Sequence, residues 1–192
     1  RQGRFVATAG RASTNVDRNA ILMFVFSGAV DMGPRLKASL PLTLAQQSEQ
    51  DDGDEYEPGV IGRKDSPFRE ARFVATGTVD TDSVSIAAPS PGGGVTQAKG
   101  VFFRVSVPRK NGRRLFKNRF TFNPRFVLAS FASPQEIDYN PEGYDANTRY
   151  DVVLDGGPNA ANPFDTVTNL SGVPLATPLV TFFETTDQYL QD

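Results

Sequence analysis

The stretch NPEGYDANTRYDVVLDGG, residues 140–157, places a short alternating segment between two turns rich in Asn, Pro, Gly and Asp. Tyr150, Val152 and Leu154 occupy every second position, so we expect them to share the buried face of a strand over residues 149–154. Arg149 and Asp151 are expected on the opposite face. A catalytic loop and a structural corner can both have this composition, and the remainder of the chain decides between them.

Strand-like segments recur along all 192 residues of the chain. Gly (17 residues) and Pro (14 residues) are frequent without a period, which suits short strands joined by turns. A weak helical pattern over residues 36–50 is interrupted by Pro41. The sequence therefore predicts an all-β fold, a sandwich or a barrel. We expect strands near residues 4–9, 20–27, 40–45, 72–79, 83–87, 100–107, 118–122, 126–131, 149–154 and 180–185.

Two of these segments carry further information. AILMFVFS, residues 20–27, is apolar on both faces, which is typical of a central strand covered on both sides. GVFFRVSV, residues 100–107, alternates, so we expect one face toward the core and the other outside. The expected core face is Val101, Phe103, Val105 and Val107, and the expected outer face is Arg104 and Ser106.

The composition excludes several classes of chemistry. The chain contains neither Cys nor His, so the common zinc, haem and iron–sulfur sites and the Ser-His-Asp and Cys-His catalytic groups cannot form. No pair of carboxylates stands out as a glycosidase site, and we expect no enzymatic activity. The longest apolar run, residues 20–26, is too short to span a bilayer. The chain begins with Arg, so we expect a processed form or a fragment.

The segment around Tyr150 resembles the tyrosine corner of immunoglobulin-like (Ig-like) sandwiches, in which the Tyr hydroxyl bonds to the backbone just upstream. Tyr144 takes the apolar position before the turn DANT, and Tyr150 takes the corner position. NVDRNAILMFVFSGAVD at 15–31 resembles the opening of bacterial Ig-like domains of S-layer and other cell-surface proteins. RFTFNPRF at 119–126 and NLSGVPLATPLVTFFETTDQY at 169–189 resemble later parts of the same domains, in the same order.

The resemblance implies an Ig-like β-sandwich of antiparallel Greek-key sheets, one domain over residues 1–192 with its core at 16–189. Because such domains usually have about 100 residues, we expect a large insertion near residues 33–75. The resemblance also implies an extracellular, non-catalytic structural module, secreted or on the bacterial cell surface, in a surface layer, fibre or adhesin. A carbohydrate- or polymer-binding module of a secreted protein and a viral capsid or decoration subunit are the alternatives.

Two acidic clusters are candidate Ca²⁺ sites, because Ca²⁺ binds several oxygen ligands on flexible loops. A solvated charge run explains the first, in the loop 46–59, and Asx-type turn bonds explain the second, so we expect no cofactor and keep calcium as the alternative. The first cluster contains Asp51, Asp52, Asp54 and Glu55. The second contains Asp138, Asn140, Glu142 and Asp145.

A basic segment over residues 104–125 contains no acid and is interleaved with Phe. Such a composition can bind single-stranded nucleic acid through phosphate contacts and base stacking. We favour a hairpin over a nucleic-acid partner, because Asn111-Gly112 is a preferred turn dipeptide. The hairpin tip carries the candidate assembly contact, which consists of Arg109, Lys110, Arg113 and Arg114.

Charge is divided along the chain. Residues 136–192 hold ten acids and one base, whereas residues 1–135 hold twelve acids and nineteen bases. If these parts form different surfaces, copies of the chain attract one another head to tail and build filaments or arrays. If folding interleaves them, the asymmetry disappears. The expected partners are copies of the chain itself or sister Ig-like domains.

Overall fold

The computed structural model describes residues 5–8, 12–38, 72–109, 112–130, 133–157 and 165–190. These residues contain thirteen β-strands and no α-helix, which confirms the predicted all-β class. Within the described ranges, no helix has the length and apolar character needed to cross a bilayer. The expected strand at 40–45 and the acidic loop at 46–59 lie outside the described residues.

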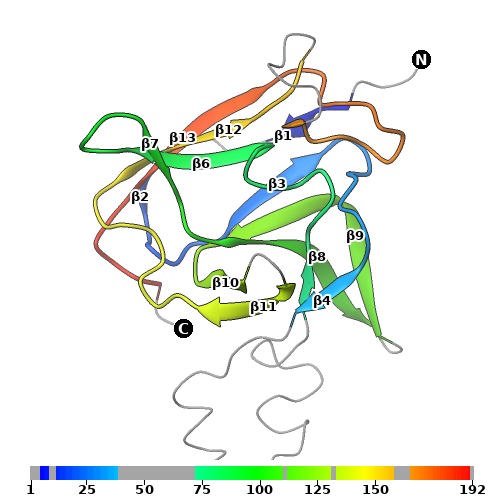
Figure 1. Cartoon of the computed structure of the whole chain (residues 1–192), viewed down its shortest axis with the longest axis horizontal. Helices are drawn as coiled ribbons and strands as arrows, with labels where there is room; N and C mark the ends of the chain where they lie inside the picture. The colour runs from blue at the N-terminus through cyan, green and yellow to red at the C-terminus, as the bar shows by residue number, and fades with distance from the viewer. Residues whose placement is uncertain are drawn as a thin grey trace, which may run out of the picture.

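The larger sheet has six strands in the order β1-β3-β9-β8-β5-β4, and all neighbours are antiparallel (Figure 1). Its strands are β1 (Ala7–Thr8), β3 (Leu22–Phe26), β9 (Gly112–Asn123), β8 (Val101–Arg109), β5 (Arg72–Val74) and β4 (Leu36–Ala38). β4 and β5 come from the expected insertion at 33–75, and they extend this sheet beyond β8 rather than forming a sheet of their own.

The second sheet has five strands in the order β2-β13-β12-β6-β7. Its strands are β2 (Ser13–Val16), β13 (Leu179–Thr185), β12 (Arg149–Leu154), β6 (Val84–Pro89) and β7 (Val95–Gln97). β2 runs parallel to β13, and the other neighbours are antiparallel. The chain therefore passes from the first sheet to the second between β1 and β2.

The two sheets face each other around a core rich in Phe. The predicted alternation holds in β12, where Tyr150, Val152 and Leu154 are buried against the other sheet. Phe24 of β3 and Phe120 of β9 stack with ring centroids 5.0 Å apart. Because each aromatic ring buries a large apolar area, this cluster supplies the main favourable free energy of the sandwich-like body.

A hairpin of β10 (Phe126–Ser130) and β11 (Ser133–Tyr139) forms a third layer over the outer face of the six-stranded sheet. Phe103 of β8 points into this layer and meets Phe126 edge to face, with ring centroids 5.9 Å apart. Phe102 instead enters the core between the sheets. The expectation that Val101 and Phe103 face the main core is therefore wrong, because the hairpin buries the second face of β8. Val107, expected on the same face, is exposed.

The basic segment forms the expected hairpin. β8 and β9 pair antiparallel up to Arg109 opposite Gly112, and residues 110 and 111 between them lie outside the described residues. The pairing shifts between Arg104 opposite Phe120 and Ser106 opposite Leu115, so β9 bulges there. β2, β4, β7 and β11 were not predicted. β2 and β7 are short, polar and exposed, so they lack the apolar alternation that marks a strand.

Candidate functional site

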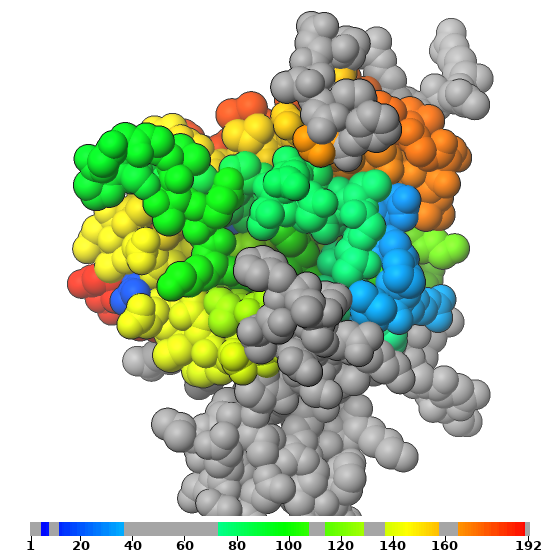
Figure 2. All heavy atoms as spheres, in the orientation of Figure 1, coloured from blue at the N-terminus to red at the C-terminus, as the bar shows by residue number. Residues whose placement is uncertain are grey.

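Three chain segments meet at one end of the two-sheet body. They are the turn at residues 17–19, the loop at residues 140–148 (the corner loop) and the segment at residues 186–190 after β13. Figure 2 shows the corner loop (yellow) beside the segment after β13 (red) on one flank of the molecule. We call this the corner end.

Tyr150 begins β12 and lies 3 % exposed beneath the corner loop. Its hydroxyl accepts a hydrogen bond from the Asp145 backbone N–H at 3.0 Å and donates to the Asp145 carboxylate at 3.2 Å. Burial, and next to it the Asp145 carboxylate, raises the pKa of Tyr150, so the hydroxyl stays neutral near pH 7. The geometry matches the bond back to the upstream backbone that defines a tyrosine corner.

Tyr144 differs from Tyr150 in one respect. It is 1 % exposed, and its ring packs against Phe183 and Tyr150 with centroids 5.0 and 5.3 Å away. Its buried hydroxyl has no hydrogen-bond partner among the described residues. Burial raises the pKa of Tyr144 well above its usual value. Tyr144 is therefore a core residue that carries an uncompensated polar group.

Side-chain and backbone hydrogen bonds connect the corner loop to neighbouring segments. Arg18 Nε donates to the Tyr144 carbonyl at 2.7 Å, and the Tyr144 N–H donates to the Arg18 carbonyl at 2.8 Å. Thr185 Oγ1 of β13 donates to the Asp145 carbonyl at 2.6 Å and accepts from the Thr148 N–H at 2.9 Å. The loop conformation is therefore fixed by contacts with residues far away in the sequence.

The segment after β13 is hydrogen-bonded to the 17–19 turn. The Asn19 side-chain amide donates to the Leu190 carbonyl at 3.0 Å and accepts from the Leu190 N–H at 2.8 Å, as a neighbouring strand would. The Arg18 guanidinium lies 4.9 Å from the centre of the Tyr189 ring, a cation–π contact. These bonds give a structural role to Asn19, which belongs to the segment 15–31 that carries part of the sequence resemblance.

Two members of the second candidate calcium cluster, Asn140 and Asp145, form hydrogen bonds within and around the corner loop. The Asn140 amide donates to the carbonyls of Pro124 at 2.8 Å and Gly143 at 3.3 Å, and Asp145 bonds Tyr150. Asp138 is exposed on β11, and Glu142 is exposed in the turn. In the part of the chain that the structure describes, no three acidic side chains come together as a metal site. The first candidate cluster, Asp51, Asp52, Asp54 and Glu55, lies outside the described residues.

The hairpin of β8 and β9 presents bases next to an aromatic ring. Arg119 lies 4.4 Å and Arg114 lies 5.8 Å from the centre of the Phe116 ring, and Arg114 and Lys117 are exposed. Lys110 and the side chains of Arg109 and Arg113 lie outside the described structure. We call the surface of Arg114, Phe116, Lys117 and Arg119 the hairpin patch.

Arg104 belongs to the same basic segment but has a structural role. Its guanidinium donates to the carbonyls of Gly33 and Pro34 at 2.5 and 2.6 Å, and to that of Val74 at 3.2 Å. Burial, together with the neighbouring charge of Arg35, lowers the pKa of Arg104. Arg104 holds the turn before β4 and is not part of the hairpin patch.

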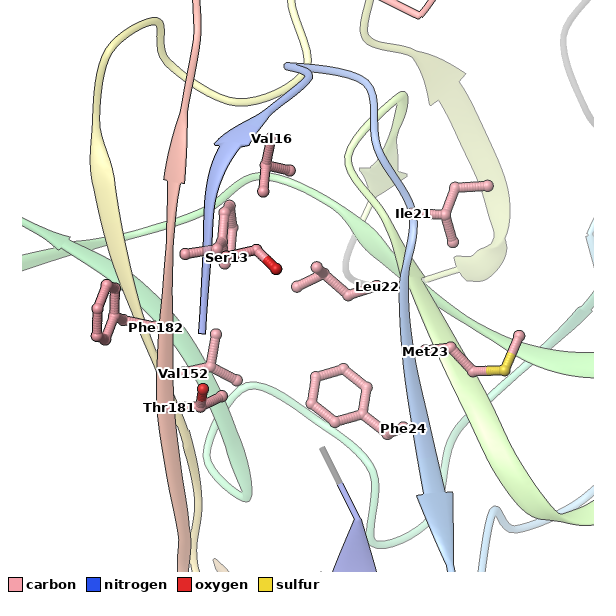
Figure 3. Close-up of a pocket in the computed structure, with 10 residues that line it drawn as sticks. Ser13, Val16, Ile21, Leu22, Met23, Phe24, Val152, Thr181 and Phe182 are labelled. Atoms are coloured by element: carbon pink, nitrogen blue, oxygen red, sulfur yellow. The ribbon is translucent and has the colours of Figure 1, made fainter. Parts of the chain in front are cut away.

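A groove opens between β2 and β3, the strands that flank one open side of the body (Figure 3). Its volume is about 220 Å³. Leu22 and Phe24 point from β3 toward β2 and β13, whereas Ile21 and Met23 point to the other side (Figure 3). Among the described residues, its lining is Ser13, Val16, Ile21, Leu22, Met23, Phe24, Val152, Thr181, Phe182 and Phe183. We call this the β2–β3 groove.

Sequence reasoning missed the β2–β3 groove because it assigned β3 to the centre of a sheet. The two-sided apolar pattern of residues 20–27 suggested cover on both faces, yet Ile21 and Met23 are 50 % and 51 % exposed. β3 lies next to the sheet edge, and among the described residues β1 pairs with it at Val25 and Phe26. The available signal was this apolar outer face, which indicates either a covering layer or a binding surface.

A carbohydrate-binding module would use an exposed shelf of aromatic side chains, and the described residues Tyr139 and Tyr144 do not form one. Tyr139 packs edge to face on Phe126 with Arg125 over its ring, and Tyr144 is buried in the core. Tyr56 lies outside the described residues.

Comparison with known proteins adds no relative, since no family model, curated protein or solved structure matches the chain.

Proposed function

We propose that the chain is an Ig-like β-sandwich. The seven strands of such a domain, A to G, form one sheet in the order A-B-E-D and another in the order C-F-G. If β1, β3, β6, β8, β9, β12 and β13 are taken in sequence as A to G, the observed orders β1-β3-β9-β8 and β6-β12-β13 match both sheets. The Tyr150 hydroxyl bond at the start of β12, the F position, supports the same assignment.

The remaining strands are additions to that frame. β4 and β5 follow the B position and extend the first sheet, and β2 and β7 extend the second at its two edges. The β10–β11 hairpin lies between the E and F positions and covers the first sheet from outside. These additions account for part of the extra length that the sequence resemblance left over.

We further propose a non-catalytic structural module, secreted or on a bacterial surface, that joins copies or sister modules end to end. The observation that carries this proposal is the chemical difference between the two ends of β9. The hairpin patch lies toward its first residue, Gly112, and the corner end adjoins its last residue, Asn123. Arg119 and Arg114 lie four and nine residues before Asn123, on the order of 13 and 30 Å along an extended strand, so the patch and the corner end are separate surfaces.

The two ends differ in charge. The hairpin patch carries Arg114, Lys117 and Arg119 with no acid in the segment 104–125. At the corner end Arg18 is engaged by Tyr144 and Tyr189. The exposed acids around it are Asp138, Glu142, Asp145 and Asp187. Contact between unlike ends neutralises both, and a heterologous contact of this kind repeats without closing.

The test is light scattering on the chain at low and high ionic strength. Because the screening length falls from about 10 Å at 0.1 M salt to about 3 Å at 1 M, we expect association to weaken as salt rises. Arg114→Glu should weaken association severalfold at low salt. Arg35→Glu, an identical charge change at an exposed position before β4, is the matched control and should have a smaller effect.

A charge exchange makes the test specific. Combining Arg114→Glu with Glu142→Lys restores opposite signs across the proposed contact, so we expect association to recover. Exposed ion pairs contribute about 0.2–1 kcal/mol each, which corresponds to a modest but measurable recovery. A chain that stays monomeric at every salt and protein concentration, or an exchange variant no better than either single variant, would contradict end-to-end assembly.

A further inference from the structure

A turn at residues 169–173, before β13, adjoins the hairpin patch. Val30 connects the two, because its N–H donates to the Lys117 carbonyl at 2.8 Å and its backbone forms an antiparallel bridge with Asn169. Figure 1 shows the segment that contains this turn (orange) on the same flank as the bend of β9. The turn and the basic part of β9 therefore belong to one continuous surface.

Hydrogen bonds within the turn fix its shape. The Asn169 side-chain oxygen accepts from the N–H groups of Ser171 and Val173, both at 2.9 Å. The Asn169 N–H donates to the Val173 carbonyl, and the Gly172 N–H donates to the Asn169 carbonyl, also at 2.9 Å. In this shape the side chains of Leu170 and Val173 are 63 % and 49 % exposed. We call these two side chains the apolar tip.

The apolar tip lies in an uncharged part of the chain with cations on the adjoining strand. No Asp, Glu, Lys or Arg occurs from residue 166 to residue 183. In the described structure, no carboxylate pairs with Arg114, Lys117 or Arg119 of the hairpin patch. An apolar centre beside unpaired charges is the arrangement of a protein contact, in which the centre supplies affinity and the charged rim sets register and rate.

The corner end presents the complementary combination of apolar and acidic groups. Tyr189 and Leu190 are 42 % and 54 % exposed. The Tyr189 hydroxyl donates to the Glu142 carbonyl at 3.4 Å, and the side chains of Glu142 and Asp187 are exposed. Figure 2 shows the segment of the apolar tip (orange) on the right flank, and the corner loop (yellow) with the segment after β13 (red) on the left flank. A contact between these flanks can therefore repeat in one direction.

We propose that the apolar tip forms the centre of the contact between copies and packs against Tyr189 and Leu190 of a second copy. This inference rests on the proposed end-to-end assembly and adds the part of the contact that salt does not screen. An anionic lipid surface would also match the apolar tip and the cations beside it. It would leave the acids and the exposed apolar side chains of the corner end without a role, whereas a second copy accounts for both flanks.

Single substitutions separate the apolar centre from the charged rim, with sedimentation analysis as the measure of association. Leu170→Ser removes an apolar side chain that the contact buries, so association should weaken about tenfold or more at low and at high salt. Arg114→Glu should weaken association at low salt only, because high salt screens its charge. Val180 is 72 % exposed on β13. Val180→Ser is therefore the matched control, and it should change association by less than about threefold.

Mixing two variants tests which flanks meet. The Leu170→Ser and Leu190→Ser chains should each stay largely monomeric at a concentration where the parent chain associates. An equal mixture should form dimers, because the first variant supplies an intact corner end and the second supplies an intact apolar tip. These dimers should not grow further, since both of their free ends carry a substitution. Unchanged urea unfolding of each variant shows that the fold is retained.

The outcomes distinguish the apolar centre from end-to-end assembly as such. A parent chain that associates while Leu170→Ser associates equally well, a mixture that stays monomeric, or equal weakening by Val180→Ser would overturn the apolar centre alone. A parent chain that is monomeric at every salt and protein concentration would overturn both. Binding of the parent monomer to vesicles of phosphatidylcholine and phosphatidylglycerol, lost in the Leu170→Ser chain, would assign the apolar tip to a lipid surface and overturn the second copy.

Discussion

Two glycine-containing turns at the same end of the molecule behave differently. Gly143 in the corner loop has φ +63°, and a Cβ added there would lie 2.1 Å from the Arg18 carbonyl oxygen. Gly93 in the turn between β6 and β7 has φ +86°, and a Cβ there would meet nothing within 4 Å. Both positions use the left-handed backbone that glycine adopts without cost. Only Gly143 also needs the absence of a side chain.

The difference teaches that hydrogen-bond partners decide how strictly a turn is specified. The β6–β7 turn bonds to itself, through Gly93 N–H to the Ser90 carbonyl and Ser90 N–H to the Gly94 carbonyl, and it projects from the body (green in Figure 2). The corner loop bonds to β13 and to the 17–19 turn. A change in the corner loop therefore disturbs three segments, and a change in the β6–β7 turn disturbs one.

The largest effect is expected for Gly143→Ala. Left-handed backbone costs an alanine roughly 1–2 kcal/mol, and the overlap with the Arg18 carbonyl adds about 1–3 kcal/mol of overpacking strain. Gly93→Ala has the cost of the left-handed backbone without any steric overlap, so it is the matched control for Gly143→Ala. Urea unfolding of both variants measures the difference. Equal losses of stability would show that the close approach of Gly143 to Arg18 does not exist in solution.

An intermediate effect is expected for the two corner tyrosines, with opposite signs. Tyr150→Phe removes a hydroxyl bonded to Asp145 and should cost on the order of 1 kcal/mol. Tyr144→Phe removes a buried hydroxyl that lacks a partner and should stabilise the protein by a similar order. Thermal and urea unfolding of the two variants check the signs. Destabilisation by Tyr144→Phe would indicate that its hydroxyl finds a partner in solution.

The pH dependence of the stability of Tyr144→Phe adds an independent check. The pKa of Tyr144 is raised in the folded state. Above the unfolded pKa of about 10, the unfolded chain therefore loses this proton more readily than the folded protein, and the free energy of unfolding falls as pH rises. The Phe variant lacks this loss. Its advantage over the parent chain should therefore grow above about pH 10, and a constant difference across that range would argue against a buried Tyr144 hydroxyl.

The smallest effect is expected for inserting two glycines after Gly93. Lengthening a flexible surface loop costs little, about 0.6 kcal/mol for each doubling of its length. The same insertion after Ala146 separates Tyr150 from its Asp145 partner and should cost several times more. Comparing the two insertions by urea unfolding tests whether the corner loop is specified by distant contacts while the β6–β7 turn is not.

Local patterns predicted the parts of the fold that depend on local residues. Alternation in residues 149–154 matches β12 in its bounds and its buried face. The expected hairpin in the basic segment matches the antiparallel pair β8 and β9, in which Gly112 is already a strand residue opposite Arg109. The resemblance to a tyrosine corner, rather than a local pattern, implied that the Tyr150 hydroxyl bonds to upstream backbone, and the Asp145 N–H donates to that hydroxyl.

Features set by distant segments could not be read from the sequence. The apolar residues of β8 gave no indication that β10 and β11 would cover Phe103 on a second face. The apolar run at 20–27 did not show that Ile21 and Met23 on its outer face would stay exposed. The calcium candidates Asn140 and Asp145 could not be separated from turn ligands until their partners Pro124 and Tyr150 were known.

The parallel pairing of β2 with β13 determines how the body resists being stretched. Ser13 lies opposite Phe183 and Val16 opposite Thr185, and the ladder continues through Arg18 N–H to the Gln188 carbonyl and the Asn19 amide on Leu190. Tension that draws the start of β2 away from the end of β13 pulls the two strands lengthwise past each other. All these bonds then share the load and must break together, whereas an antiparallel pair pulled from one end would open one bond at a time.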